Sequence, residues 1–101
     1  MLELIVTKQF RRDLIRAHDI ISNQQPYVNP NAARRLFKHV DTTIDQIRDF
    51  PYVSQVAYSD SAHQLRCRRV SGTNFRIIYT IVGNEIIILS LIGKGYDFSR
   101  Q

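Results

Sequence analysis

The first part of the chain changes from a strand-like pattern to a helical one. Residues 2–6 are apolar or β-branched apart from one glutamate, and the run ends at polar Thr7, which predicts a short strand near a sheet edge. From residue 7 to about residue 24, apolar positions recur at steps of four, three and four, which predicts an amphipathic helix. The stripe consists of Phe10, Leu14, Ala17 and Ile21.

A second helix is predicted after a segment that contains two prolines. Asn29 supplies a helix N-cap and Pro30 a first-turn proline. The helix ends at Phe50, because the residue before Pro51 is pushed out of helical geometry. Two antiparallel helices then form a hairpin. The apolar stripe of the second helix consists of Ala33, Leu36, Phe37, Val40, Ile44 and Ile47.

The C-terminal half is dense in β-branched and aromatic residues. It predicts three antiparallel strands over residues 65–70, 75–82 and 85–92, with Gly83 and Asn84 as a two-residue hairpin turn between the last two. Residues 52–64 show no clear period, so we expect a connection there with room for one short strand. Beyond Gly93-Lys94-Gly95, the polar and aromatic tail would be ordered only by docking.

These elements predict a β-α-α-β-β-β order in one domain over residues 1–101. The fold class is α+β with two layers, a helical hairpin packed on one face of a mostly antiparallel sheet. Hydrophobic residues make up 44% and charged residues 23% of the chain, which is typical of a globular domain. No apolar run approaches the roughly 20 residues of a membrane span, and the N-terminus lacks a secretory signal pattern. We therefore expect a cytoplasmic protein without a membrane contact.

The predicted turns determine which residues lie opposite each other. With the two-residue turn, Ile78 lies opposite Leu89 and Arg76 opposite Leu91, and Leu91 belongs to the face away from Ile92. Both faces of the sheet are then apolar. Because two helices cover one face, the other must be covered by the tail, by curvature of the sheet or by another protein, and we expect an obligate partner.

A four-residue loop at 71–74 places Arg69 directly opposite Arg76, with Cys67 opposite Ile78. Like charges in this position destabilise a strand pair, and no acid lies near them on these strands. A phosphate is the natural ligand, because guanidinium groups offer planar, bidentate donors. Two alternatives are that the arginines splay apart into water and that the loop shifts the register by one residue.

The charge of the chain is concentrated in its C-terminal part. The net charge is +5; residues 1–64 hold eight basic and seven acidic residues, whereas residues 65–101 hold six and two. Such a field attracts phosphate-bearing or acidic partners. Cys67 is the only cysteine, which excludes an internal disulfide, and we interpret it as a small buried apolar residue. The three histidines lack metal-ligand spacing, so no metal and no cofactor are predicted.

Several segments resemble the RelE/ParE toxins of type II toxin-antitoxin modules. They are residues 65–72 (LRCRRVSG), 74–79 (NFRIIY) and 83–85 (GNE) with the isoleucine-rich strand that follows. The helical hairpin also looks like that family, so the resemblance covers nearly the whole chain. In such modules a cognate antitoxin wraps the toxin and neutralises it. The resemblance thus implies a hetero-oligomer with an antitoxin, which would account for the uncovered apolar face.

The RelE-like branch cuts mRNA in the ribosomal A site, where the ribose 2′-OH attacks the adjacent phosphate. This reaction needs cations for the developing charge and groups that move two protons. Arg76 matches the strand arginine of that branch and Arg69 a basic position on the preceding strand. The sequence departs from the pattern at Cys67, where another basic residue is frequent, and at Gly95, where an arginine is expected.

By their proximity along the chain, Lys94, Tyr96 and Arg100 are the candidates to substitute for the groups that this pattern lacks. Lys94 is the candidate for stabilising charge and Tyr96 for moving a proton, with the alternative that Tyr96 anchors the tail to the sheet. The catalytic candidates are therefore Arg76, Arg69, Lys94 and Tyr96. The candidate nucleic-acid contacts are Arg66, Arg68, Arg69, Arg76 and Arg100.

The ParE-like branch binds and poisons DNA gyrase without a comparable acid-base set, and its helical hairpin resembles this one at least as well. Arg69 and Arg76 would then contact an acidic protein or DNA phosphates. A nucleic-acid-binding module without toxicity is a third alternative, but it lacks a groove-reading helix. We interpret the chain as a growth-arresting toxin, with a slight preference for ribosome-dependent mRNA cleavage over gyrase poisoning; whether it is an enzyme stays open.

Overall fold

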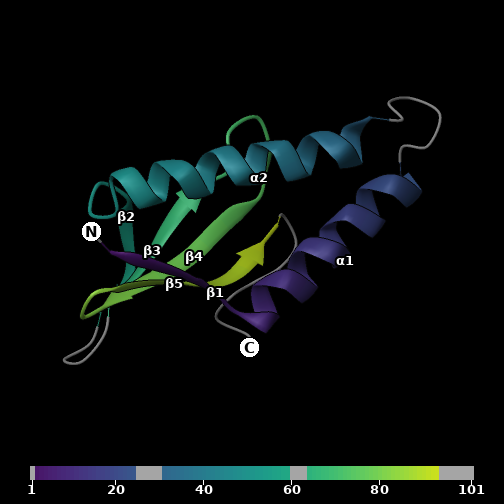
Figure 1. Cartoon of the computed structure of the whole chain (residues 1–101). Coiled ribbons are helices and arrows are strands. Elements are labelled where there is room, and N and C mark those ends of the chain that lie inside the picture. The colour runs from purple at the N-terminus through teal and green to yellow at the C-terminus, as the bar shows by residue number, and fades with distance from the viewer. Residues whose placement is uncertain (1, 25–30, 60–63, 94–101) are drawn as a thin grey trace.

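The computed structural model describes residues 2–24, 31–59 and 64–93, and this part of the chain forms two helices and five strands (Figure 1). The predicted α+β class and order of elements are confirmed, and a short strand occupies the connection where the sequence left room for one. The elements are β1 (Glu3–Val6), α1 (Lys8–Gln24), α2 (Ala32–Asp49), β2 (Gln55–Ser59), β3 (Gln64–Arg69), β4 (Arg76–Val82) and β5 (Glu85–Ile92).

The strands form one mixed sheet in the order β1-β5-β4-β3-β2. β1 runs parallel to β5, and the other neighbouring strands are antiparallel. Thr7 joins β1 to α1. Its hydroxyl oxygen lies 2.8 Å from the carbonyl oxygen of Ile88 and 3.2 Å from the backbone nitrogen of Phe10, which donates to it. Thr7 therefore fixes the end of β1 against β5 and caps the first turn of α1.

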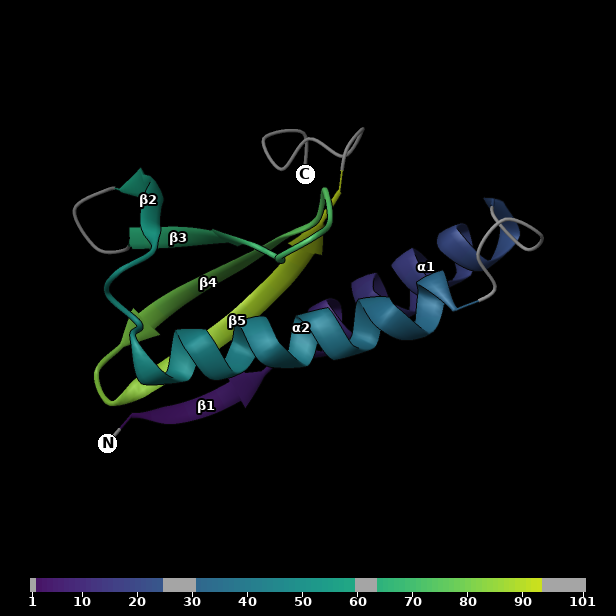
Figure 2. The same ribbon diagram turned by 90° about the horizontal axis from the view of Figure 1, so that it is seen from above.

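Both helices pack on the same face of the sheet (Figures 1 and 2). The ring of His18 in α1 stacks on that of Phe37 in α2, with a centroid distance of 4.8 Å, so these two residues join the helices. Phe37 is otherwise exposed, and Thr43 takes a buried place on the α2 stripe that the sequence did not predict. The buried core comprises Phe10, Ala17, Leu36, Val40, Ile47, Val70, Ile77, Tyr79, Ile86, Ile88 and Leu91.

A β-bulge between β4 and β5 corrects the predicted register of β5. Before the bulge the pairs follow the prediction, but beyond it Ile78 pairs with Ser90 and Arg76 with Ile92, each one residue later than expected. The extra residue reverses the alternation, so that Leu91 enters the core instead of the opposite face. Ser90 interrupts the apolar run at the bulge, but a single serine does not show that the register shifts there.

Two further expectations concern local detail. α2 begins at Ala32, with Asn31 at the N-cap position, whereas the cap predicted at Asn29 and Pro30 lies outside the described residues. Cys67 pairs with Ile78 as predicted, but its side chain is half-buried and not part of the core.

The sheet face away from the helices is partly open. Ile78, Thr80 and Ser90 are buried on it, whereas Ile5 and Val82 are exposed near its margins. Figure 2 shows that β2 and β3 turn away from the plane of β4 and β5, so the sheet is strongly twisted. The predicted second apolar face is therefore only partly exposed.

Candidate functional site

The predicted juxtaposition of two arginines is confirmed. Arg69 at the end of β3 pairs with Arg76 at the start of β4. Because Ile77 and Tyr79 point into the core, the alternation of β4 places Arg76 on the face away from the helices, and Arg69 shares that face. Both side chains are exposed, so the pair forms a cationic site that solvent and ligands reach.

The two guanidinium groups of this pair are differently held. The Nε of Arg69 donates to the carbonyl oxygen of Thr73 at 3.0 Å, which fixes the side chain against the β3–β4 loop and leaves its terminal nitrogens available. Arg76 makes no hydrogen bond or ion pair, and neither arginine meets a carboxylate, within the described part of the chain. The mutual repulsion of the pair is therefore not offset there, and an anionic group would relieve it.

Arg66 and Arg68 lie on the other face of β3. They pair with Tyr79 and Ile77, whose side chains face the helices. The NH1 of Arg66 donates to the carbonyl oxygens of Tyr52 at 3.1 Å and Ser54 at 2.9 Å. These bonds tie β3 to the segment that precedes β2.

Arg68 is also engaged within the chain. Its NH2 donates to the side-chain oxygen of Gln46 in α2 at 3.0 Å, and its NH1 lies 3.5 Å from the hydroxyl of Ser54. Together with Arg69, Ser71 and Gly72, Gln46 and Arg68 border an open depression at the end of β3. The five predicted nucleic-acid contacts are thus divided: Arg69 and Arg76 share one face, Arg66 and Arg68 hold the fold on the other, and Arg100 lies outside the described residues.

Proton-transfer groups are the part of the predicted set that the structure does not bring to the arginine pair. The residues that register places next to the pair are Cys67, Ile78 and Ile92, none of which is a carboxylate, histidine or tyrosine. The candidates Lys94 and Tyr96 lie outside the described residues. The strand positions beside the pair therefore offer no general acid or base of those types. The ring of His39 in α2 lies against the β3–β4 loop instead, where a Cβ on Gly72 would be 3.8 Å from it.

Tyr79 is the described tyrosine closest in sequence to the pair, and it is a core residue. Its hydroxyl donates to the carbonyl oxygen of Pro51 at 2.6 Å. Burial raises the pKa of this hydroxyl above its ordinary value, an effect that the charges of Arg66 and Arg68 oppose. A buried phenol with its proton held by a backbone carbonyl serves as a structural donor.

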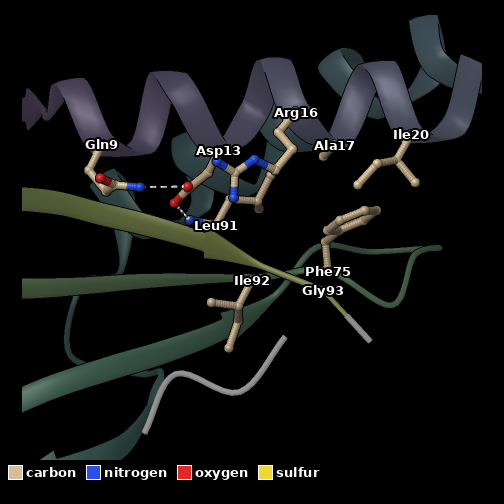
Figure 3. Close-up of a pocket in the computed structure, with 9 residues that line it drawn as sticks. All are labelled: Gln9, Asp13, Arg16, Ala17, Ile20, Phe75, Leu91, Ile92 and Gly93. Carbon is tan, nitrogen blue, oxygen red and sulfur yellow. Dashed lines mark hydrogen bonds between the residues drawn. The ribbon is translucent and has the colours of Figure 1, made fainter. Parts of the chain in front are cut away.

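A separate pocket of about 280 Å³ lies between α1 and the end of β5 (Figure 3). The carboxylate of Asp13 points from α1 to the sheet edge, where it accepts from the backbone N–H of Leu91 at 3.1 Å and from the side-chain amide of Gln9 at 2.8 Å. Arg16 extends over the same side of the helix. Asp13 therefore accepts a backbone hydrogen bond from the edge of β5, beyond the last residue of β5 that pairs with β1.

One residue that lines this pocket, Gly93, has to be a glycine. A Cβ on Gly93 would lie 2.7 Å from a ring atom of Phe75, so only glycine allows the ring to pack against the end of β5. This pocket was not predicted from the sequence. Asp13, one of two acids in α1, was the available signal, but its inward direction depends on where β5 runs.

The described chain shows neither a metal site nor a membrane helix. Across residues 2–24, 31–59 and 64–93, no three His, Cys, Asp or Glu side chains gather as metal ligands would. Neither α1 nor α2 combines the length and the apolar character that a bilayer crossing requires.

Solved toxin structures share this fold. The structure of the chromosomal ParDE toxin-antitoxin system of P. aeruginosa matches with a TM-score of 0.64 and 18% identity over 92% of this chain and 96% of that chain. The RelBE2 toxin-antitoxin complex of Mycobacterium tuberculosis matches with a TM-score of 0.56 and 21% identity, over 91% of this chain and 96% of that chain. The archaeal RelE-RelB complex of Pyrococcus horikoshii matches with a TM-score of 0.51 and 18% identity, over 95% of this chain and 98% of that chain.

The sequence itself decides the family. No curated protein matches significantly. The family described as the ParE toxin of the type II toxin-antitoxin system parDE matches residues 4–97, which is nearly the whole chain and includes every described element but the first residue of β1. This chain therefore belongs to the ParE toxin family of type II toxin-antitoxin systems.

Proposed function

We propose that this toxin arrests growth by binding and poisoning DNA gyrase, the activity that its ParE resemblance implies, and that it acts in the cytoplasm. The observation that carries the proposal is the family match over residues 4–97. The geometry supports it, because the exposed Arg69–Arg76 pair offers a cationic contact surface, and the residues that strand register places next to it include no carboxylate, histidine or tyrosine. Such a surface suits binding to acidic groups more directly than acid-base catalysis.

The proposal is tested by two assays on the same culture. Cells briefly expressing the toxin are examined for gyrase-linked DNA breaks and, by primer extension, for new 5′ ends in mRNA. We expect gyrase-linked breaks and intact mRNA. Arg76→Ala should abolish the breaks, whereas Arg34→Ala, which removes an exposed arginine of α2, should leave them unchanged.

Ribosome-dependent mRNA cleavage is the second candidate, and one observation favours it. The guanidinium of Arg76 has no partner among the described residues, so its donors are available to stabilise the charge of a developing phosphorane. In that case Lys94 would add charge stabilisation and Tyr96 would move a proton. New 5′ ends within translated codons, without DNA breaks, would replace gyrase by mRNA as the target. Arg76→Ala should then slow cleavage by about 10²–10³-fold, the effect of removing one preorganised donor.

We also propose that a cognate antitoxin holds this toxin inactive in a hetero-oligomer. One structural relative is a toxin-antitoxin complex by name and another is a RelE-RelB complex, and the face of this sheet away from the helices keeps exposed apolar residues. Co-expression of the toxin with its antitoxin should restore growth and yield one complex on size-exclusion chromatography. Two separate peaks, with growth still arrested, would contradict the proposal.

A further inference from the structure

The segment between α2 and β2 combines a fixed backbone with apolar side chains in solvent. We call residues Phe50–Val53 the knuckle; it forms the turn at the C-terminal end of α2 (Figure 1). The side chains of Phe50, Tyr52 and Val53 are 62%, 64% and 73% exposed. With Val56 and Tyr58 of β2, this stretch contains five of the nine large hydrophobic residues that are exposed in the described chain. Exposed apolar residues gathered in this way are typical of an interaction site.

The knuckle is held from beneath by side chains of the sheet. The hydroxyl of Tyr79 donates to the Pro51 carbonyl at 2.6 Å, and NH1 of Arg66 donates to the Tyr52 carbonyl at 3.1 Å and to the Ser54 carbonyl at 2.9 Å. The guanidinium of Arg66 also lies 5.4 Å from the centre of the Tyr52 ring. The backbone thus has little freedom to fold its apolar side chains inward.

A fixed apolar surface is suited to binding for a physical reason. Ordering a loop on association costs free energy, and a loop already held in one conformation avoids that cost. Burying large, rigid side chains such as Phe50 and Tyr52 in a partner's pocket then contributes most of the affinity, as at the hot spots of protein interfaces. An exposed aliphatic side chain such as Val53 adds area without much conformational entropy loss.

The charges around the knuckle favour a protein over a nucleic acid. Residues 50–59 contain no Lys, Arg, Asp or Glu. The neighbouring Arg66 and Arg68 are engaged in hydrogen bonds within the chain. Nucleic-acid contacts depend on free cations that meet phosphates, and the knuckle offers none.

The knuckle and Arg69 both lie toward the C-terminal end of β3. Gln55, at the start of β2, pairs with Cys67, two residues before Arg69. The open depression bordered by Gln46, Arg68 and Arg69 lies between the two features, with Gln46 one helical turn before Phe50. An apolar projection near an exposed cationic pair complements a protein surface that carries an apolar pocket next to carboxylates.

We propose that the knuckle is the apolar anchor with which this toxin binds its protein target, beside the electrostatic contact made by Arg69 and Arg76. This assignment rests on the proposed function, because it takes the target to be a protein, DNA gyrase. It adds the residues that supply the affinity and the chemistry of the surface that receives them.

The test is the double variant Phe50→Ala with Val53→Ala, which keeps Tyr52 and all clamping hydrogen bonds. Ile15→Ala is the matched control, since Ile15 is 60% exposed on α1, far along the chain from the knuckle. Binding of each purified toxin to gyrase, to the antitoxin and to a single-stranded oligonucleotide is measured by surface plasmon resonance, with thermal unfolding as the test of folding. We expect the double variant to bind gyrase at least about tenfold more weakly, the loss typical of hot-spot truncation. Its antitoxin affinity and melting temperature should equal those of the control.

The outcomes separate this inference from the function on which it rests. Wild-type toxin that binds gyrase, with a double variant that binds equally well, overturns the knuckle assignment and leaves the proposed function intact. Wild-type toxin that does not bind gyrase refutes both. A double variant that loses the antitoxin, or binding to a single-stranded oligonucleotide, while retaining gyrase assigns the knuckle to that partner instead and overturns the proposal.

Discussion

β3 carries arginines on both of its faces, and the arginines of the two faces differ in their contacts. Arg66 and Arg68 face the helices, are half-buried and donate to Tyr52, Ser54 and Gln46. Arg69, one residue further on, faces the other way beside Arg76 and is exposed. The pleat of a strand therefore divides a run of arginines into two groups, and the acceptors within reach decide which group stabilises the fold and which is available to a partner.

The largest difference between the two groups is expected in stability. Arg66→Ala leaves the carbonyls of Tyr52 and Ser54 without their donor, and we expect it to lower the free energy of unfolding by about 1–2 kcal/mol. In a domain of this size that lowers the melting temperature by roughly 4–8 °C per kcal/mol. Thermal and urea unfolding of the purified variant measure the change.

The control for Arg66→Ala is Arg76→Ala, which removes the same side chain from the other face. Because Arg76 makes no described hydrogen bond, its loss should change the free energy of unfolding by less than about 0.5 kcal/mol. Equal destabilisation by the two variants would show that the division between a structural and an available face of the strand pair is wrong.

An intermediate effect is expected from Tyr79→Phe, which removes one clamp from beneath the knuckle. The lost hydrogen bond to the Pro51 carbonyl should cost about 0.5–1.5 kcal/mol at neutral pH, while the buried ring stays in place. Hydrogen exchange at residues 50–54 should become faster. Unchanged exchange there would mean that the clamp does not restrict this segment.

The same variant gives a pH test. Because burial raises the pKa of the Tyr79 hydroxyl, the folded protein holds this proton more tightly than the unfolded chain. Its contribution is complete below the ordinary pKa of 10.0 and is lost as the pH rises above that value. Wild-type protein should therefore lose stability above pH 10 more steeply than Tyr79→Phe. Parallel curves in urea titrations would contradict this.

The smallest effect is expected from relieving the charge repulsion between Arg69 and Arg76. Arg69→Gln keeps a donor at this position and removes one of two like charges that lie directly opposite, so it should stabilise the fold by about 0.2–1 kcal/mol. Added sulfate should stabilise the wild-type protein more than this variant if the pair binds anions. A loss of stability in low salt would show that repulsion in the pair is negligible.

Local patterns were sufficient for most of the elements. The apolar stripes of α1 and α2 predict both helices, and the β-branched runs with a glycine turn predict β4 and β5, because helical and strand periods depend on near neighbours. The pairing of Arg69 with Arg76 followed from loop length alone. The bulge near Ser90 could not be predicted in this way, since it depends on how β5 is held between β4, β1 and α1.

The sequence by itself determined the order of elements, the position of the arginine pair and the family, because periodicity, turn length and motif residues are properties of the chain read in order. Only the tertiary structure decided which arginines brace the segment before β2, which face receives Leu91 and where the knuckle is fixed. These depend on which carbonyls and side chains from distant segments meet β3 and β5. These contacts are determined by packing between distant segments and not by any local sequence pattern.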